Sequence, residues 1–459
     1  MSARFVRGLA SVLFLAPLLV TAFDMSRNDN VAVYWGQNSY GASHGGDPAN
    51  WQKSLAFYCQ DDSVDTFPLA FLDIAFDAGG LPSFDLSNIC SVHDNSVFPG
   101  TNLPNCAFLA SDITTCQSKG KIITLSIGGA TGAIDFTSDS QAQAFADTVW
   151  NLFLGGSSST RPFGNAVLDG VDLDIESGSS THFAAFVSQI RSHASAASKK
   201  YYVTAAPQCP YPDVLMNPIL DAVGFDAVYV QFYNNFCGLP GFNDPNKWNF
   251  GSWDTWAKTV SPNKNVKVYI GAPASGTAAG SGYVSASQLS SIAQQTRSQY
   301  SSFGGVMLWE ASEAYANGKF AAAVKAGIAG GNASPPPTSS KPSHTTATST
   351  VPQGSSTSST SSKHHHTTAT TTVSSSSSTS QTSSSPTTTT TTATSACGDV
   401  APWVSNAAYV AGNQVKYNGH VWTAKQWSEA GVPGGASGDW TDDGPCASAR
   451  VNSRIVGRS

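Results

Sequence analysis

Eight short apolar runs follow one another through the first two thirds of the chain, mostly separated by segments of helical periodicity. The predicted strands are residues 31–37, 70–76, 121–127, 166–175, 201–206, 227–232, 267–272 and 305–309. Residues 139–153 and 181–197 have apolar side chains at helical spacing. Strands that alternate with helices predict a parallel sheet. Eight such units over about 300 residues predict a (β/α)8 barrel, slightly above its typical length.

One predicted strand carries an acidic residue at every second position. Asp172, Asp174 and Glu176 alternate with apolar residues, so their side chains lie on one face, about 6–7 Å apart along the strand. Asp169 has the opposite parity, and we expect it to point away and to be structural. Buried carboxyl groups this close should not all ionise, so at least one pKa should be raised. A carboxylic acid that stays protonated near neutral pH can act as a general acid.

The alternative for this strand is a solvated acidic edge or a calcium site. Its intervening residues are apolar, it ends in a Ser/Gly loop that would open a cleft, and strand–helix units surround it. These features favour a buried catalytic strand.

Further polar and aromatic side chains occur at or just past the carboxyl ends of the predicted strands, where active sites of this fold lie. They are Tyr34, Ser126, Gln231, Tyr233 and Trp309. Each aromatic residue taken singly is explained equally well by packing. Their shared position makes the set a candidate substrate-binding site.

The first 22 residues resemble a secretory signal peptide. Two arginines precede an apolar stretch at 9–20, which is too short to span a bilayer comfortably, and small residues follow at 20–22. A signal anchor is the alternative. The eight cysteines then predict disulfides in an oxidising compartment. They are Cys59, Cys90, Cys106, Cys116, Cys209, Cys237, Cys397 and Cys446.

Composition narrows the ligand class. The formal net charge is −6, and charged residues make up 12% of the chain, which argues against a nucleic-acid partner. Low charge together with many Trp and Tyr side chains favours a neutral polar ligand such as a sugar. No cysteine or histidine spacing matches a zinc site, so we expect no metal and no cofactor. We also expect a secreted monomer without a membrane span after the signal.

The composition changes after the predicted barrel, which we place at 28–330. Residues 331–396 begin with a proline run and continue as a Ser/Thr tract that has too few apolar residues to fold. We predict a disordered, O-glycosylated linker there. Asn332 begins an N-glycosylation sequon.

Residues 397–446 form a second predicted unit, and the tail 447–459 is expected to be disordered. Short antiparallel strands are predicted at 414–417 and 420–424. A disulfide between Cys397 and Cys446 would stabilise this small unit. Four Trp side chains exceed what such a small core can bury, so some should be exposed for ligand contact. The candidates are Trp422, Trp427 and Trp440. A dimerisation patch is the alternative.

Several motifs resemble glycoside hydrolase family 18, specifically the class III chitinases of plants and fungi. Residues 169–176 match the DxxDxDxE motif of that family, and residues 126–129 match its SxGG motif. Segments 34–38, 205–210 and 231–235 are also similar, and the resemblance covers about residues 28–328. The C-terminal unit is similar to small chitin-binding modules of the family 5/12 type. That similarity is carried by Trp403, Tyr409, Gly412, Val415, Tyr417, Gly419 and the segment 422–425.

The resemblance implies a secreted endo-acting chitinase that hydrolyses β-1,4 links between N-acetylglucosamine units of chitin. Glu176 would protonate the glycosidic oxygen. Asp174 would orient the 2-acetamido group and stabilise an oxazolinium intermediate, and Asp172 would share a proton with Asp174. Tyr233 would hydrogen-bond the acetamido oxygen.

The resemblance also assigns supporting roles. Trp309 would form the floor under the reacting sugar, while Tyr34 and Gln231 would contact that sugar. The implied disulfides are Cys59–Cys116, Cys90–Cys106 and Cys209–Cys237. Glu310 departs from the family pattern, because plant members have a smaller polar residue there; it could alter the cleft or its pH response.

Ordinary glycosidases need a second carboxylate across the scissile bond, whereas substrate-assisted enzymes do not. Asp174 and Glu176 lie on one strand, and no second acidic motif supplies an opposed nucleophile. The acetamido group of the substrate would take that role, with retention of configuration. Two rival functions are a non-catalytic lectin or inhibitor and an endo-β-N-acetylglucosaminidase that acts on N-glycans.

Overall fold

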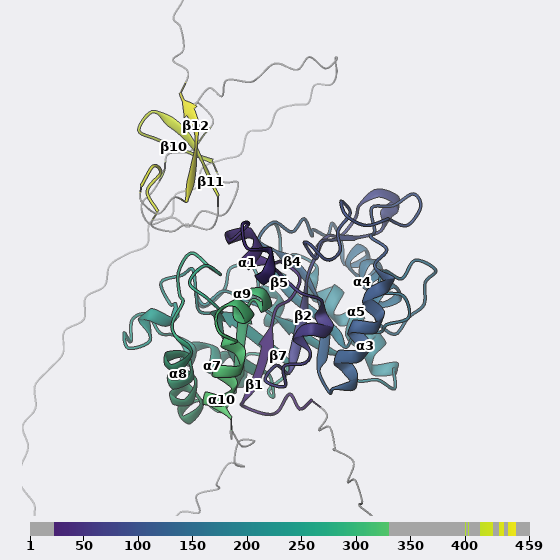
Figure 1. Cartoon of the computed structure of the whole chain (residues 1–459), viewed down its shortest axis with the longest axis horizontal. Helices are drawn as coiled ribbons and strands as arrows, with labels where there is room; N and C mark the ends of the chain where they lie inside the picture. The colour runs from purple at the N-terminus through teal and green to yellow at the C-terminus, as the bar shows by residue number, and fades with distance from the viewer. Residues whose placement is uncertain are drawn as a thin grey trace, which may run out of the picture. The chain divides into compact units, whose positions relative to one another are not determined.

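The computed structural model describes residues 23–329, 400, 403, 414–425, 431–435 and 439–446. The predicted signal peptide, the whole of the predicted linker and the tail lie outside these residues, as do Asn332, Cys397 and Trp427. Residues 23–329 and the small C-terminal sheet are described separately below (Figure 1).

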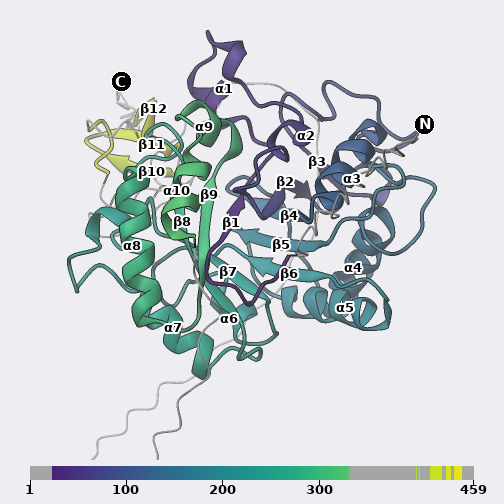
Figure 2. The ribbon, with the colours of Figure 1, turned by 60° about the horizontal axis from the view of Figure 1, so that its bottom comes forward.

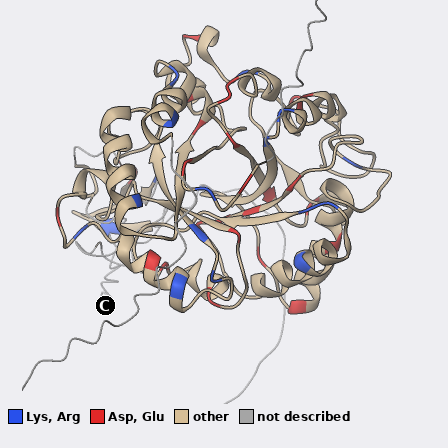
Figure 3. Ribbon diagram, turned by 90° about the horizontal axis from the view of Figure 1, so that it is seen from below, with Lys and Arg blue, Asp and Glu red and all other residues tan. Residues whose placement is uncertain are grey.

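Eight parallel strands close into a barrel. They are β1 (Asn30–Val33), β2 (Thr66–Ile74), β4 (Ile122–Gly129), β5 (Gly170–Ile175), β6 (Tyr202–Ala205), β7 (Ala227–Gln231), β8 (Lys267–Pro273) and β9 (Phe303–Trp309). Neighbours in sequence pair in parallel, and β1 closes the ring by pairing with both β9 and β2. Figure 3 shows this ring with helices around it. A short strand, β3 (Ser83–Phe84), pairs antiparallel with β2. The predicted (β/α)8 fold is confirmed.

Helices cover the outer face of the barrel (Figure 2). They are α1 (Ser39–Ser43), α2 (Leu55–Tyr58), α3 (Ala110–Ser118), α4 (Asp139–Phe153), α5 (Phe183–Ala196), α6 (Asn217–Leu220), α7 (Phe250–Thr259), α8 (Ala286–Gln299), α9 (Ala311–Ala316) and α10 (Phe320–Ile328). Helix α4 matches its prediction because Ser138 caps it, accepting from Gln141 N, and Phe145 and Val149 recur on its buried face. Within the described residues, no helix has both the length and the apolar character needed to cross a membrane.

The barrel has two layers of core. Alternate strand residues such as Val31 and Val33 point outward and pack beneath the helices. The residues between them point inward, where aromatic rings fill the barrel. Tyr229 lies between Tyr34 and Tyr269, with ring centroids 6.5 and 5.0 Å away. The interior is therefore a packed core, and a ligand can enter only at an end of the barrel.

The last helix is fastened to the first strands at the amino ends of those strands. Lys325 of α10 donates from Nζ to the carbonyl of Asp29 and to Oδ2 of Asp65, both at 2.7 Å. The same Asp65 oxygen accepts the amide of Val31 at 2.7 Å. The carboxyl group of Asp65 thus joins α10 to β1 close to the point where the ring closes.

Three disulfides hold the loops of the barrel. They are Cys59–Cys116, Cys90–Cys106 and Cys209–Cys237. These pairs confirm the three that the family resemblance implies. Cys446 is also disulfide-bonded, and its predicted partner lies outside the described residues.

The C-terminal unit contains a three-stranded antiparallel sheet: β10 (Gln414–Tyr417), β11 (His420–Ala424) and β12 (Trp440–Pro445). The first two strands match their predicted bounds. Strand β12 was not predicted from its sequence, because Asp, Gly and Pro are depleted in strands.

The three described Trp side chains of this unit differ in exposure. Trp440 is 5% exposed, packs with Val415 and Ala424, and donates from Nε1 to the carbonyl of Gly431. Its predicted role in ligand contact is therefore wrong, because its ring fills the core. Trp403 and Trp422 pack against that core and stay partly exposed.

Candidate active site

Asp172 lies at the base of the site, and the register of the sheet explains its surroundings. It is paired with Ser126 of β4 and Thr204 of β6, so both hydroxyls reach its carboxyl group. Thr204 donates to Oδ1 at 2.6 Å, Ser126 donates to Oδ2 at 2.7 Å, and Tyr34 also donates to Oδ2 at 2.6 Å. Burial raises the pKa of Asp172, while the three hydroxyl groups oppose that rise.

Asp174 and Glu176 form a pair above Asp172. Their carboxyl groups lie close enough that each shifts the pKa of the other, and one shared proton would allow a hydrogen bond between them. Burial raises the pKa of both groups, and the charges of Glu176 and Asp172 raise the pKa of Asp174 further. The shared proton was predicted between Asp172 and Asp174. In this structure the partner of Asp174 is Glu176, because both oxygens of Asp172 already accept hydroxyl groups.

Gln231, the last residue of β7, holds this pair in place. Its Nε2 atom lies 3.0 Å from Oδ1 of Asp174, 3.3 Å from Oε1 of Glu176 and 2.9 Å from the carbonyl of Ala206. Asp213 lies nearby and accepts backbone amides from the loop after β6. Its charge adds to the raised pKa of Asp174 and Glu176.

These residues face a cavity of about 390 Å³ at the carboxyl ends of the strands. Five of the predicted site residues line it: Asp174, Glu176, Gln231, Tyr233 and Trp309. The indole ring of Trp309 stacks on Phe71, with ring centroids 5.8 Å apart and an interplanar angle of 19°. Burial raises the pKa of the Tyr233 hydroxyl, as do the charges of Asp174 and Glu176. Tyr233 therefore remains a neutral hydroxyl group that can donate a hydrogen bond.

Tyr34 does not line the cavity, so its predicted contact with the sugar is wrong. Its side chain is 1% exposed and lies beneath Trp309, with ring centroids 5.5 Å apart. The hydroxyl group of Tyr34 is directed to Asp172. Tyr34 thus donates a hydrogen bond to the carboxyl group of Asp172 at the base of the site.

The glycines of the SxGG motif allow the cavity to form. Gly128 has φ +113°, and a Cβ there would meet the carbonyl oxygen of Asp174 at 2.3 Å. Gly129 has φ +84°, and a Cβ there would meet the ring of Phe71 at 2.8 Å. A larger residue at either position would displace the acidic strand or the aromatic floor.

Two further carboxyl groups line the cavity and belong to none of the motifs recognised in the sequence. Asp73 lies near the end of β2, and its buried Oδ1 atom has no hydrogen-bond partner among the described residues. Burial raises the pKa of Asp73 to about 6. Asp85 follows β3 and accepts the amide of Ser87 at 2.6 Å. No feature of the sequence singled out Asp73, because it falls in the middle of the predicted strand 70–76, whereas β2 ends at Ile74.

The departure of Glu310 from the family pattern is explained by a role in capping a helix. Its buried carboxyl group caps α9 and accepts the amides of Ser312 and Glu313, and it also accepts the Ser312 hydroxyl. Burial raises the pKa of Glu310 to about 7. The carboxyl group does not line the cavity.

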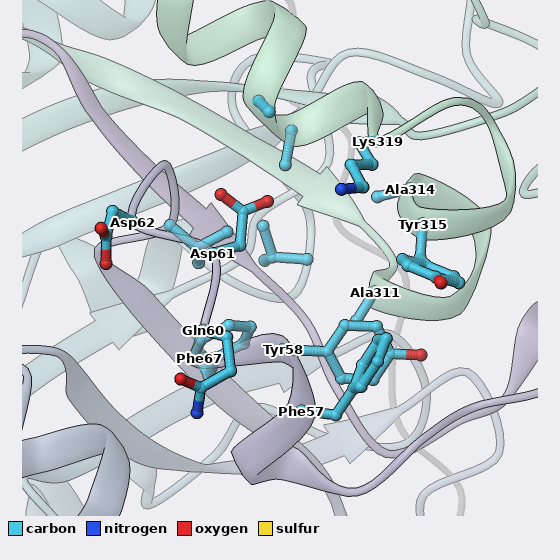
Figure 4. A pocket seen from close by; sticks show the side chains of 14 residues that line it. Phe57, Tyr58, Gln60, Asp61, Asp62, Phe67, Ala311, Ala314, Tyr315 and Lys319 are labelled. Carbon is cyan, nitrogen blue, oxygen red and sulfur yellow. The ribbon is translucent and has the colours of Figure 1, made fainter.

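A second pocket, of about 480 Å³, lies outside the ring of strands and is lined mainly by residues from α2, α9 and α10 and from the loop before β2. Figure 4 shows Phe57, Tyr58 and Tyr315 in its wall, with Asp61, Asp62 and Lys319 around it. None of the predicted catalytic residues lines this pocket. In the part of the chain that the structure describes, no cluster of His, Cys, Asp and Glu is arranged to hold a metal ion.

A (β/α)8 barrel that holds a coupled carboxyl pair in an aromatic-floored cavity is the arrangement of a glycoside hydrolase. The sequence model of glycosyl hydrolases family 18 matches residues 30–299, more than half of the chain. The protein therefore belongs to glycosyl hydrolase family 18.

Relatives with established names support this membership. Chitinase 2 of Rhizopus oligosporus is 49% identical over 320 residues, which cover 70% of this chain and 56% of that protein. The chain thus spans only about half the length of this relative.

Two solved structures are similar to the barrel. The ICChI chitinase from Ipomoea carnea has 31% identity and a TM-score of 0.54, covering 65% of this chain and all of that one. The xylanase and α-amylase inhibitor protein XAIP-II from Scadoxus multiflorus has 30% identity and a TM-score of 0.53, with 64% and 97% covered. The second similarity shows that this architecture is also used by an inhibitor.

Proposed function

We propose that this protein is a secreted, endo-acting chitinase that cleaves β-1,4 links between N-acetylglucosamine units by a retaining, substrate-assisted mechanism. The observation that carries the proposal is the closeness of Asp174 and Glu176 in the cavity at the mouth of the barrel, where burial raises the pKa of both carboxyl groups. The family and the name of the Rhizopus relative support the choice of chitin.

In the first step, Glu176 gives its proton to the glycosidic oxygen, and the bond to the anomeric carbon breaks. The carbonyl oxygen of the substrate's own 2-acetamido group attacks that carbon from the opposite face and forms an oxazolinium ion. Asp174 stabilises the positive charge that develops on the acetamido nitrogen, and Tyr233 donates to the acetamido oxygen. Glu176, now ionised, accepts a proton from the water that opens the ring, so the configuration is retained.

The raised pKa of the pair suits the first step, because Glu176 must be protonated when the substrate binds. Asp172 lies beneath the pair and accepts hydrogen bonds from three hydroxyl groups. Its negative charge disfavours ionisation of Asp174. The pair is therefore biased towards holding one proton, which can move between Asp174 and Glu176.

Asp73 and Asp85 create an alternative that the sequence motifs did not suggest, since each is a carboxyl group in the same cavity. If Asp73 were an opposed nucleophile, the acetamido group would not be needed. The Asp73→Asn variant tests the point: a nucleophile's loss would reduce hydrolysis of every substrate as severely as the loss of Glu176.

The central experiment compares Glu176→Gln with Glu310→Gln in the hydrolysis of chitin hexamers. Both changes convert a carboxyl group whose pKa is raised by burial to an amide, but Glu310 lies outside the cavity. We expect Glu176→Gln to lose roughly 10²- to 10⁴-fold in kcat and Glu310→Gln to stay near wild type. Wild-type rates in Glu176→Gln would overturn the proposal.

A non-catalytic lectin or inhibitor is the second candidate, favoured by the similarity to XAIP-II. It predicts binding of chitin oligomers without release of products from colloidal chitin. Hydrolysis of a high-mannose glycoprotein in preference to chitin would instead indicate an endo-β-N-acetylglucosaminidase.

The C-terminal unit is proposed to bind chitin and to concentrate the enzyme on an insoluble polymer. Trp422 is its described candidate contact, together with Trp427 outside the described residues. Secretion is supported by the signal-like start of the sequence and by three disulfides, which form in oxidising compartments.

A further inference from the structure

The charges around the cavity are one-sided. Four carboxyl residues line it, and no Lys, Arg or His is among the described residues that do so. Asp174 and Glu176 bind each other and Gln231, and Asp85 accepts a backbone amide. Asp73 differs from these three, because its buried Oδ1 atom has no partner among the described residues.

Asp73 is placed to meet a sugar other than the one at the reacting bond. It lies on β2, which is separated from the acidic strand β5 by β4. Two strand spacings separate the two backbones by about 10 Å, so Asp73 and Glu176 enter the cavity from different positions around the barrel. Phe71 lies two residues earlier on the same strand and stacks on Trp309. Asp73 therefore faces the same cavity at one side of the aromatic floor.

A carboxylate in this position can distinguish a protonated amine from a neutral acetamido group, whereas an amide cannot. The N–H group of a neutral acetamido substituent can bond either a carboxylate or an amide oxygen. A protonated amine gains a charge-assisted hydrogen bond only from the carboxylate. An unpaired acidic oxygen in a cavity without cationic side chains is costly when ionised, and a ligand that brings a positive charge would offset that cost.

We propose that Asp73 makes the cavity accept partially deacetylated chitin, by binding the protonated 2-amino group of a glucosamine unit next to the unit held at Glu176. This inference rests on the proposed chitinase function and specifies its substrate. The mechanism requires an acetamido group only on the sugar that forms the oxazolinium ion. The neighbouring sugar units on either side can therefore lack the acetyl group.

The surroundings of Asp73 support this assignment. Burial raises its pKa to about 6, and the charges of Asp85 and Asp77 add to the rise. A cationic sugar would relieve this repulsion. A protonated amine bound beside Asp73 favours the ionised carboxylate, so binding of the cationic sugar should lower the pKa of Asp73.

The test compares kcat/KM on fully acetylated and partially deacetylated chitin oligomers of equal length, for wild type, Asp73→Asn and Asp73→Glu. We expect the preference ratio for the deacetylated substrate to fall roughly tenfold in Asp73→Asn, equivalent to about 1.4 kcal/mol. Asp73→Glu should restore part of the ratio, because it restores the charge. In wild type the ratio should also fall as salt rises, since the attraction is electrostatic, and in Asp73→Asn it should respond less to salt because one of the four carboxyl groups is gone.

The outcomes separate this inference from the proposed function. If wild type does not hydrolyse the acetylated oligomer, the chitinase function itself fails. If wild type hydrolyses both substrates and Asp73→Asn changes both rates in the same proportion, only the role of Asp73 is overturned. Binding measured in the Glu176→Gln background gives a second readout, in which Asp73→Asn should weaken the deacetylated oligomer selectively.

Discussion

Gln231 donates a 3.0 Å hydrogen bond from Nε2 to Oδ1 of Asp174, and the same nitrogen lies 3.3 Å from Glu176. One neutral amide thus supports both members of a coupled acid pair. Such a contact stabilises the ionised form of Glu176 and holds its pKa lower than burial alone would.

Replacement of Gln231 by Leu should therefore raise the pKa of Glu176. Because Glu176 must be protonated to act as the acid, activity falls as pH rises through this pKa. That descending limb should move to higher pH, by up to about one unit, and kcat should drop roughly tenfold. The pH profile of kcat measures both effects.

Gln117→Leu is a matched control for this prediction. Gln117 also donates from Nε2 to a carboxylate, that of Asp169, but lies away from the cavity. Its loss should reduce stability and leave the pH profile unchanged. An unchanged profile in Gln231→Leu as well would show that the amide does not tune the pair.

Tyr34→Phe removes one of three hydroxyl donors to Asp172. The pKa of Asp172 should rise, since the lost hydrogen bond favoured its ionised form. A less ionised Asp172 repels negative charge on Asp174 less and so changes the pKa of Asp174. We expect kcat to fall by about tenfold while KM stays within about twofold. A rise in KM alone would instead show direct contact with the sugar. Tyr269→Phe, which loses a hydroxyl bonded to Asn30, is the control.

Glu310→Gln should alter how stability depends on pH. The pKa of Glu310 is about 7 in the folded protein and 4.5 ordinarily. Between these values the folded state retains a proton that the unfolded state releases. The free energy of unfolding therefore falls as pH rises, by about 1.4 kcal/mol per unit and roughly 3 kcal/mol in all.

The Gln variant lacks this proton, while the other buried carboxyl groups contribute equally to both proteins. Its stability relative to wild type should therefore improve as pH rises from about 4.5 to 7 and be constant above that range. Denaturant unfolding at several pH values measures the difference. Parallel pH curves would mean that Glu310 titrates normally.

Two Trp residues of the small sheet should have different roles, Trp440 in the stability of the unit and Trp422 in its binding to chitin. Trp440→Ala should cost roughly 3–5 kcal/mol or unfold the unit, because the ring is buried. Trp422→Ala should weaken adsorption to chitin particles with a smaller loss of stability, because Trp422 is partly exposed. Adsorption isotherms and thermal unfolding of the full chain provide both measurements. Equal adsorption by Trp422→Ala and wild type would remove Trp422 from the binding surface.

The periodicity of the chain was enough to predict the barrel and the shared face of Asp172, Asp174 and Glu176. It did not predict Thr204, because a threonine within an apolar strand is ordinary until the register places it beside Asp172. The position of Tyr34 at a strand end was correct, but only packing beneath Trp309 decides that its ring is covered. Asp73 was missed because a single acidic residue forms no pattern.

The attachment of α10 through Lys325 to Asp29 and Asp65 has a consequence for any second domain. It directs the chain out of the barrel at the amino ends of the strands, whereas the cavity opens at their carboxyl ends. The described barrel ends at Ala329 on this side, and the cavity lies at the other end of the strands, about 23 Å away along a seven-residue strand such as β9. If the C-terminal unit binds chitin as proposed, a segment between Ala329 and that unit shortened below this length should reduce hydrolysis of chitin particles while leaving hydrolysis of soluble oligomers unchanged.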